Sequence, residues 1–273
     1  MTALSYRAAP PVDPGLVSRA LEVAGRLAND AADVIAATAG RGARPGVKES
    51  PFDWVTDTDR TLERHTRRVL ANEFDIPIVG EEFEPDDRAL TSEFRWVVDP
   101  VDGTANYVAG LPWCVYSLGL VDAHGPVVGV IADPYHAQIY AAARGRGMRA
   151  NGMPVRLPER CDLRGGIVCT ELTDGRPWPG MVEFIQGVAS GSCGMRVLGS
   201  SALSITQVAL GHAVAAVLDS YHEWDVAAAL ALAIEAGAVV LNRSGEPDPL
   251  PKDGLLVAAA DAAHEVFSWW TGS

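Results

Sequence analysis

The order of β-type and helical segments changes near the middle of the chain, and this change constrains the fold more than any other feature. Residues 113–121, 126–133 and 138–143 are β-type runs joined by short turns, which predicts consecutive antiparallel strands. From residue 157 onward, strand and helix patterns alternate, as is typical of an α/β layer. We therefore expect an α/β (α+β) fold, with an antiparallel-sheet half over residues 1–156 and an α/β half over residues 157–273.

Two helices with apolar residues on one face are predicted ahead of that sheet, over residues 14–39 and 58–73. Short apolar strands are predicted at 76–79 and 94–98, and both lead directly into acidic residues. Acidic side chains at two strand ends are the first sign of a binding site. The second half is predicted to contain strands at 167–170, 213–218, 238–241 and 255–259, and helices at 181–189, 201–210, 226–236 and from Ala262.

The composition limits the partners of the chain. It has 273 residues, with 22 Lys and Arg against 35 Asp and Glu, and a net charge of −13. This excess of negative charge argues against nucleic acid and membrane as partners, but a bound cation would still permit a phosphorylated substrate. The N-terminus lacks a signal-peptide run, and the most apolar stretch, 226–241, is interrupted by Glu235 and shorter than the ~20 residues that span a bilayer. Four scattered cysteines without a C-x-x-C pair are typical of reduced thiols, so a cytoplasmic protein is expected.

The strongest chemical signal is the segment D-P-V-D-G-T at residues 99–104. Its two carboxylates lie three residues apart, on a backbone that Pro100 restricts and Gly103 allows to turn tightly. If a helix begins at this turn, its free amides and the Thr104 hydroxyl would receive an anion. Carboxylates beside such a turn suit Mg²⁺ together with phosphate. The alternative is an ordinary turn in which an Asp caps a helix.

Three other acidic segments are ambiguous when each is considered alone. The sequence G-E-E at 80–82 is more often a solvated loop, and helix capping explains Asp59 and Asp225 equally well. No G-x-S-x-G, H-E-x-x-H or P-loop motif occurs, which excludes the serine-hydrolase, zinc-protease and P-loop interpretations.

The acidic segments gain meaning from their order. They are K-x-x-x-x-D-x-V-T-x-x-D at 48–59, G-E-E at 80–82, D-P-V-D-G-T-A-N-Y at 99–107, W-D at 224–225 and E-A-G at 235–237. Together they resemble the inositol monophosphatase family, part of the Mg²⁺-dependent, lithium-sensitive phosphatase superfamily. The resemblance covers nearly the whole chain and implies a layered αβαβα sandwich, a metal site where the two halves meet, and a homodimer.

The resemblance implies a metal centre with two or three Mg²⁺ per site. Glu81, Asp99 and the carbonyl of Val101 would hold the first ion, and Asp99, Asp102 and Asp225 would hold the second. Two such ions can activate a water and neutralise a phosphate in an in-line displacement. Several carboxylates in one pocket could not all stay ionised without cations.

The resemblance also implies the catalytic and phosphate-binding residues. Asp59 and Thr104 would orient and deprotonate the attacking water, and Asp59 with Glu81 would support a weaker third metal. The amides of Gly103 and Thr104 would bind the phosphate. Other residues on the substrate or phosphate side would be Asp102, Ser201 and Asp225, with Glu82 and Lys48 in supporting positions.

One departure from the family bears on the substrate. Inositol phosphatases carry a substrate-binding Glu at the position of Leu218, where Asp219 or Glu223 would be the available replacement. We therefore predict a Mg²⁺-dependent phosphomonoesterase that hydrolyses a small polyol phosphate such as inositol 1-phosphate. The enzymatic alternatives are a histidinol-phosphate phosphatase, a fructose-1,6-bisphosphatase or a nucleotide 3′-phosphatase. The non-enzymatic alternative is an inactive relative that binds a metal or a phosphorylated metabolite.

Overall fold

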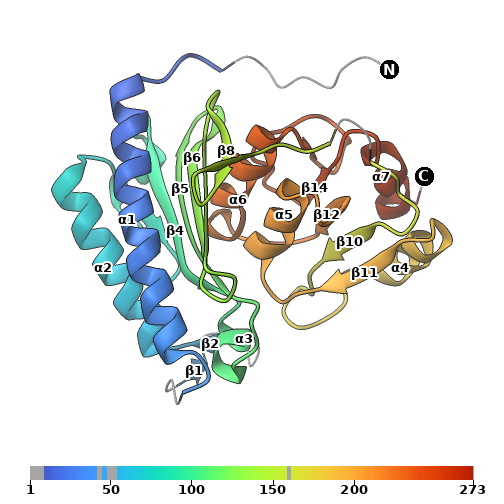
Figure 1. Ribbon diagram of the computed structural model, residues 1–273, viewed down its shortest axis with the longest axis horizontal. Helices are drawn as coiled ribbons and strands as arrows, with labels where there is room; N and C mark the ends of the chain where they lie inside the picture. Colours follow the sequence, from blue (N-terminus) through green and yellow to red (C-terminus); the bar gives the residue numbers. More distant parts are fainter. Residues whose placement is uncertain (1–8, 42–44, 48–53, 159–160, 273) are drawn as a thin grey trace.

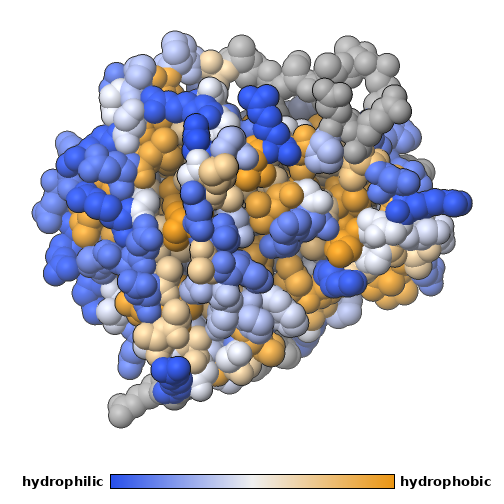
Figure 2. Space-filling model, viewed as in Figure 1, coloured by the Kyte–Doolittle hydropathy of each residue, from blue (hydrophilic) through white to orange (hydrophobic). Residues whose placement is uncertain are grey.

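Two β-sheets alternate with three layers of helices in the computed structural model, in the order αβαβα (Figure 1). The structure describes residues 9–41, 45–47, 54–158 and 161–272. Helices α1 (Pro14–Thr38) and α2 (Asp57–Glu73) cover the outer face of the larger sheet. Hydrophilic side chains predominate over this outer layer (Figure 2), while the apolar faces of the two helices lie on the sheet. The predicted fold class is confirmed.

The larger sheet consists of seven strands that follow one another in chain order. The pair β3–β4 is parallel, and each later pair is antiparallel, as the run of β-type segments predicts. Its strands are β3 (Ile78–Gly80), β4 (Arg95–Asp102), β5 (Val115–Asp122), β6 (Gly125–Asp133), β7 (Gln138–Ala143), β8 (Gly147–Ala150) and β9 (Met153–Val155).

The smaller sheet has the order β11-β10-β12-β14-β13 and combines parallel and antiparallel pairs. Two helices lie between the sheets and two on the outer side of the smaller one. The strands are β10 (Ile167–Thr170), β11 (Gly194–Val197), β12 (Ala215–Leu218), β13 (Val239–Leu241) and β14 (Leu255–Ala258). The inner helices are α5 (Ser201–Ala209) and α6 (Glu223–Ala236), and the outer ones are α4 (Met181–Ser190) and α7 (Ala263–Thr271).

Helix α6 is apolar on nearly all sides because it contacts both sheets. Gly119 and Gly129 face each other across β5 and β6, directly beneath Ala228 of this helix. Without side chains, these two glycines allow the helix backbone to approach the sheet closely. Asp225 is thereby carried at the N-terminal end of α6, close to the edge where β4 ends.

Among the predicted element boundaries that differ from the structure, two bear on the site. Strand β4 does not end at Val98 but continues to Asp102, because an irregular pairing with β5 accommodates Pro100. Helix α6 begins at Glu223 instead of Val226, so Asp225 lies in its first turn and is not its N-cap. The prediction also missed several short elements: β1 (Gly46–Val47), β2 (Trp54–Val55), η1 (Asp87–Leu90), β8, β9 and β11. The helix that the sequence left open after Gly103 is present as α3 (Thr104–Ala109).

Within the described ranges, no helix has both the length and the apolar character needed to cross a bilayer. The four cysteines are free thiols, with Cys114 and Cys169 buried.

Candidate functional site at the end of strand β4

A bulge in β4 brings Asp99 and Asp102 to the same side of the sheet. Asp99 pairs with Ser117 and Asp102 with Val115, so β4 spans three residues where β5 spans two. Side chains three apart on a regular strand point to opposite faces, and one extra residue reverses the second of them. The bulge therefore turns both carboxylates to the same face of the sheet.

Asp99 lies at the centre of a group of carboxylates. It is 2% exposed, and its Oδ1 accepts a hydrogen bond of 2.9 Å from the amide of Val101. Burial holds the pKa of Asp99 well above its usual range, and the charges of Glu81, Asp102 and Asp225 raise it further. A hydrogen bond with Glu81 acts in the same direction. Side chains from β4, from α6 and from the residue that follows β3 thus lie close enough to Asp99 to disfavour its ionisation.

Asp102 connects β4 to the first turn of α5. It accepts hydrogen bonds from the hydroxyl of Ser200 and from the amides of Ala202 (2.7 Å) and Ser201 (3.3 Å). Burial raises the pKa of Asp102 to about 6, although these donors oppose the shift. Ser201 thus joins the site through its backbone amide. Asp102 therefore links the larger sheet, through β4, to helix α5 that lies between the two sheets.

Asp59 and Thr104 form a second pair beside the carboxylates. Asp59 is fully buried in the first turn of α2, where it closes a capping box with Thr56. The hydroxyl of Thr104 lies 3.2 Å from Oδ1 of Asp59 and 3.0 Å from the carbonyl oxygen of Val101. Burial raises the pKa of Asp59, against its hydrogen bonds with Thr56 and Thr104. Capping, the alternative explanation of Asp59, therefore coexists with a contact to Thr104.

The turn between Asp102 and Thr104 requires glycine. Gly103 has φ = +94°, and a Cβ at this position would lie 2.7 Å from the carbonyl oxygen of Trp113. The turn starts α3, which presents Thr104 as its first residue. At the opposite side of the site, Asp225 is half-buried and accepts a hydrogen bond of 2.7 Å from the amide of His222.

Two residues without a predicted role hold the loop that leads into α5. Glu171 is buried and accepts hydrogen bonds from Gly199 N (2.7 Å), Leu198 N (3.2 Å) and Ser204 Oγ (2.6 Å). Asn106 donates to the carbonyls of Leu198 (2.7 Å) and Gly199 (3.3 Å) from the other side. The segment T-E-L at 170–172 lies where the family has a similar segment, but the sequence assigns Glu171 no role. Its function in the loop depends on contacts 27 to 33 positions away.

The two candidate replacements for the substrate-binding Glu are each engaged by an arginine. Asp219 pairs with Arg243, which also donates 2.9 Å to the backbone carbonyl of Asp219. Glu223 pairs with Arg95 at the start of β4. Leu218 itself is buried. The predicted replacement of the family's Glu by either residue thus finds no support in these contacts.

The donor set fits a hard divalent cation. Carboxylate oxygens are the ligands that Mg²⁺ prefers, and the mutual repulsion around Asp99 is what a cation would relieve. Within the part of the chain that the structure describes, no three His, Cys, Asp or Glu side chains form a compact metal-binding group. The oxygens of Asp99, Asp102 and Asp225 instead accept hydrogen bonds from the protein. Lys48 lies outside the described residues.

Fold and site together define an αβαβα protein whose two sheet halves meet at a cluster of buried carboxylates. Residues 16–268 match the inositol monophosphatase family. The chain belongs to this family, whose members are phosphatases, and is therefore an enzyme of the phosphoric monoester hydrolase type.

Similar proteins support this assignment. Inositol-1-monophosphatase ImpA of Mycolicibacterium smegmatis is 33% identical over 234 residues, which cover 83% of each chain. Nus factor SuhB of Pasteurella multocida is 31% identical over 262 residues, or 91% of this chain and 94% of that protein. A solved IMPase/NADP phosphatase complexed with Mg²⁺ and phosphate shares the fold, with a TM-score of 0.82, 20% identity and coverage of 94% of this chain and 97% of that chain.

Proposed function

We propose that this chain is a Mg²⁺-dependent phosphomonoesterase for small phosphate esters of the polyol type, with water as the nucleophile. The observation that carries the proposal is the group of mutually repelling carboxylates around Asp99. In this proposal, Glu81, Asp99 and the Val101 carbonyl hold one ion, and Asp99, Asp102 and Asp225 hold a second. When bound, the ions supply charge neutralisation and an activated water.

Asp59 and Thr104 supply the path for a proton in this proposal. Because the Thr104 hydroxyl donates toward Asp59 Oδ1, its oxygen lone pairs can accept a hydrogen bond from a water. That geometry orients the water, and a proton taken up at Thr104 Oγ1 is passed on as the hydroxyl proton moves to Asp59. The raised pKa of Asp59 makes it a better proton acceptor than an ordinary Asp. The amides of Gly103 and Thr104 bind the phosphate.

Loose discrimination among leaving groups follows from the ion pairs beside the site. A polyol is recognised through paired polar groups, and the two acids nearest to Leu218 are already paired with Arg243 and Arg95. We therefore infer that the phosphate is recognised strictly and the alcohol weakly. Inositol 1-phosphate is the leading substrate, with histidinol phosphate as the nearest alternative.

A substrate panel tests the proposal. Phosphate release is measured on inositol 1-phosphate, histidinol phosphate, fructose 1,6-bisphosphate and adenosine 3′,5′-bisphosphate, with Mg²⁺, with EDTA and over a Li⁺ titration. We expect Mg²⁺-dependent release, and a loss of about 100-fold or more in Asp99→Asn. Asp75→Asn, at a side chain 93% exposed, is the control. Turnover that is indifferent to EDTA would refute the mechanism, and Mg²⁺ binding without turnover on any ester would favour a binding protein.

A further inference from the structure

Helix α2 presents three charged side chains at successive turns of one face: Asp59, Glu63 and Arg67. Asp59 and Glu63 are both fully buried, and Arg67 is half-buried with a side chain 22% exposed. Asp59 contacts Thr104 in the site. Glu63 and Arg67 take no part in the proposed reaction, yet a fully buried carboxylate is costly unless its contacts are specific.

The contacts of Glu63 and Arg67 fall on the backbone that follows Glu81. Glu63 Oε2 accepts a hydrogen bond of 2.7 Å from the amide of Glu82. Glu63 Oε1 accepts one of 2.7 Å from Nε of Arg67, and Nη2 of Arg67 donates to the carbonyl of Phe83 at 3.0 Å. The Arg67 guanidinium also lies over the Phe83 ring, 5.9 Å from its centroid. The two side chains therefore hold both residues that come after Glu81.

The residue before Glu81 is fixed by the same carboxylate. A Cβ on Gly80 would lie 2.8 Å from Glu63 Oε2 and closer still to Oε1, so only glycine allows Glu63 this approach. Glu63 thus lies directly against the backbone at Gly80 and bonds the amide of Glu82. The carboxylate of Glu81, between them, forms a hydrogen bond with Asp99.

We propose that Glu63 and Arg67 are positioning residues for Glu81, which set where its carboxylate meets Asp99. Because Asp59 lies on the same face of α2, one helix fixes both the proton acceptor and the first metal ligand. The inference rests on the proposed function only in that Glu81 is a metal ligand. A merely structural ion pair, by contrast, would affect folding and leave metal affinity unchanged.

The variant Glu63→Gln tests this inference. Glutamine offers one oxygen and one NH₂ group, so either the Glu82 amide or Arg67 Nε loses its acceptor. Calorimetric titration of the EDTA-treated protein with Mg²⁺ should show affinity reduced roughly 10- to 100-fold, the usual effect of removing a partner that orients a ligand. In turnover assays, the Mg²⁺ concentration for half-maximal rate should rise while the KM for substrate stays near the wild-type value.

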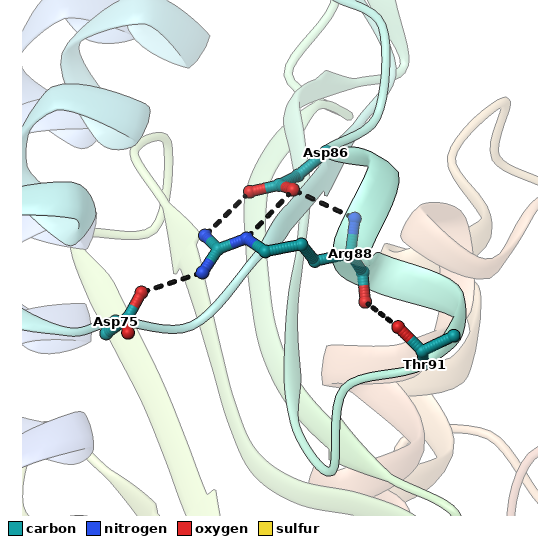
Figure 3. A network of polar contacts seen from close by, with 4 residues as sticks. All are labelled: Asp75, Asp86, Arg88 and Thr91. Carbon is teal, nitrogen blue, oxygen red and sulfur yellow. Dashed lines mark hydrogen bonds and ion pairs between the residues drawn. The ribbon is translucent and has the colours of Figure 1, made fainter.

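Two controls separate positioning from stability. Glu73→Gln removes an ion-paired carboxylate from the same helix, where Glu73 contacts Arg19 and Arg26. Arg88→Met removes an arginine from η1, between β3 and β4, where its side chain pairs with Asp75 and Asp86 and, within the described residues, forms no hydrogen bond or ion pair with Glu63 or Arg67 (Figure 3). Neither control should change Mg²⁺ affinity, whatever it does to the melting temperature.

A second variant keeps the test decisive if Glu63→Gln folds poorly. Arg67→Lys retains the charge but cannot bridge Glu63 and the Phe83 carbonyl in the same way, and it should weaken Mg²⁺ binding in the same direction. Wild-type Mg²⁺ affinity in both folded variants would overturn the inference, as would a wild-type protein that binds no Mg²⁺. If the wild type binds Mg²⁺ but releases no phosphate, the proposed function fails, and calorimetry still decides the positioning role.

Discussion

Replacing Gly129 by alanine should separate the helix that carries Asp225 from the strand that carries Asp99 and Asp102. A Cβ on Gly129 would lie 2.7 Å from Cβ of Ala231 and closer still to the carbonyl oxygen of Ala228. Ordinary contact begins at 3.4 Å, so α6 would have to move away from the sheet by roughly 1 Å. Overpacking of this kind costs about 1–3 kcal/mol of unfolding free energy.

The facing glycine provides a matched control. Gly119 pairs with Gly129 across the two strands, and a Cβ there would lie 3.3 Å from the nearest atom, the amide nitrogen of Ala228. A shift of a few tenths of an ångström accommodates it, so Gly119→Ala should change the free energy of unfolding by less than about 1 kcal/mol. Both glycines lie in β-strands without a positive φ, which leaves the steric contact as the difference between them.

Thermal melting and turnover together measure the effect. Gly129→Ala should melt several degrees below the wild type, at roughly 2–4 °C per kcal/mol for a protein of this size. Its phosphate release should fall by up to about 100-fold, because a displacement near 1 Å at a catalytic group has that effect. Equal melting temperatures and rates for Gly119→Ala and Gly129→Ala would refute the close-packing argument.

Three further predictions concern the site. In EDTA, the free energy of unfolding should fall by up to about 3 kcal/mol as the pH rises from 4 to 6, because burial raises the pKa of Asp102 to about 6 and the folded state binds its proton more tightly than the unfolded chain. Asp102→Asn should flatten the dependence of the melting temperature on pH over this range, and an unchanged dependence would contradict the prediction. Gly103→Ala should lower the free energy of unfolding, measured by urea denaturation, more than Gly152→Ala does. Both glycines have a positive φ, but only at Gly103 does a carbonyl oxygen lie 2.7 Å from the added Cβ. Equal losses in the two variants would argue against a steric requirement for glycine at this turn. Asn106→Asp should lower the melting temperature by several degrees, because an oxygen would replace the NH₂ group that lies 2.8 Å from the Trp113 carbonyl and 2.7 Å from that of Leu198; a wild-type melt would refute this.

The strand and helix patterns were sufficient to predict the two halves of the fold, whereas the αβαβα layering and the grouping of Asp59, Asp99 and Thr104 in one site followed from the resemblance of the ordered motifs to a known family. The structure brings Thr104 into contact with Asp59, and Asp99 into contact with Glu81. The bulge at Pro100–Val101 could not be predicted, because it appears only in the register between β4 and β5. Without it, residues three apart on a strand would be expected on opposite faces.

Long-range partners explain the other differences. The sequence patterns assign no role to Glu63, because its hydrogen-bond partner is the amide of Glu82, 19 positions away and outside helix α2. Glu223 meets Arg95, which is 128 positions away, and Asp219 meets Arg243, which is 24 positions away. Periodicity and motif order carry no information about such pairs. The contacts that the sequence could not predict are therefore those made between distant parts of the chain.

Two sets of buried acids in this protein differ in how their charge is balanced. Asp122 and Glu63 each bind an arginine, and Arg144 lowers the pKa of Asp122 against the effect of burial. For Asp59, Asp99 and Asp102, the described residues include no Arg, Lys or His within ion-pair distance, and burial raises the pKa of each.

The first group stabilises the fold through charge pairing. The second group lines the candidate site, where burial disfavours the charged form of each acid and a divalent cation would favour it. The net charge of −13 therefore does not make phosphate an unsuitable ligand: where the acids are concentrated, the cations they bind would make the local field favourable for an anion.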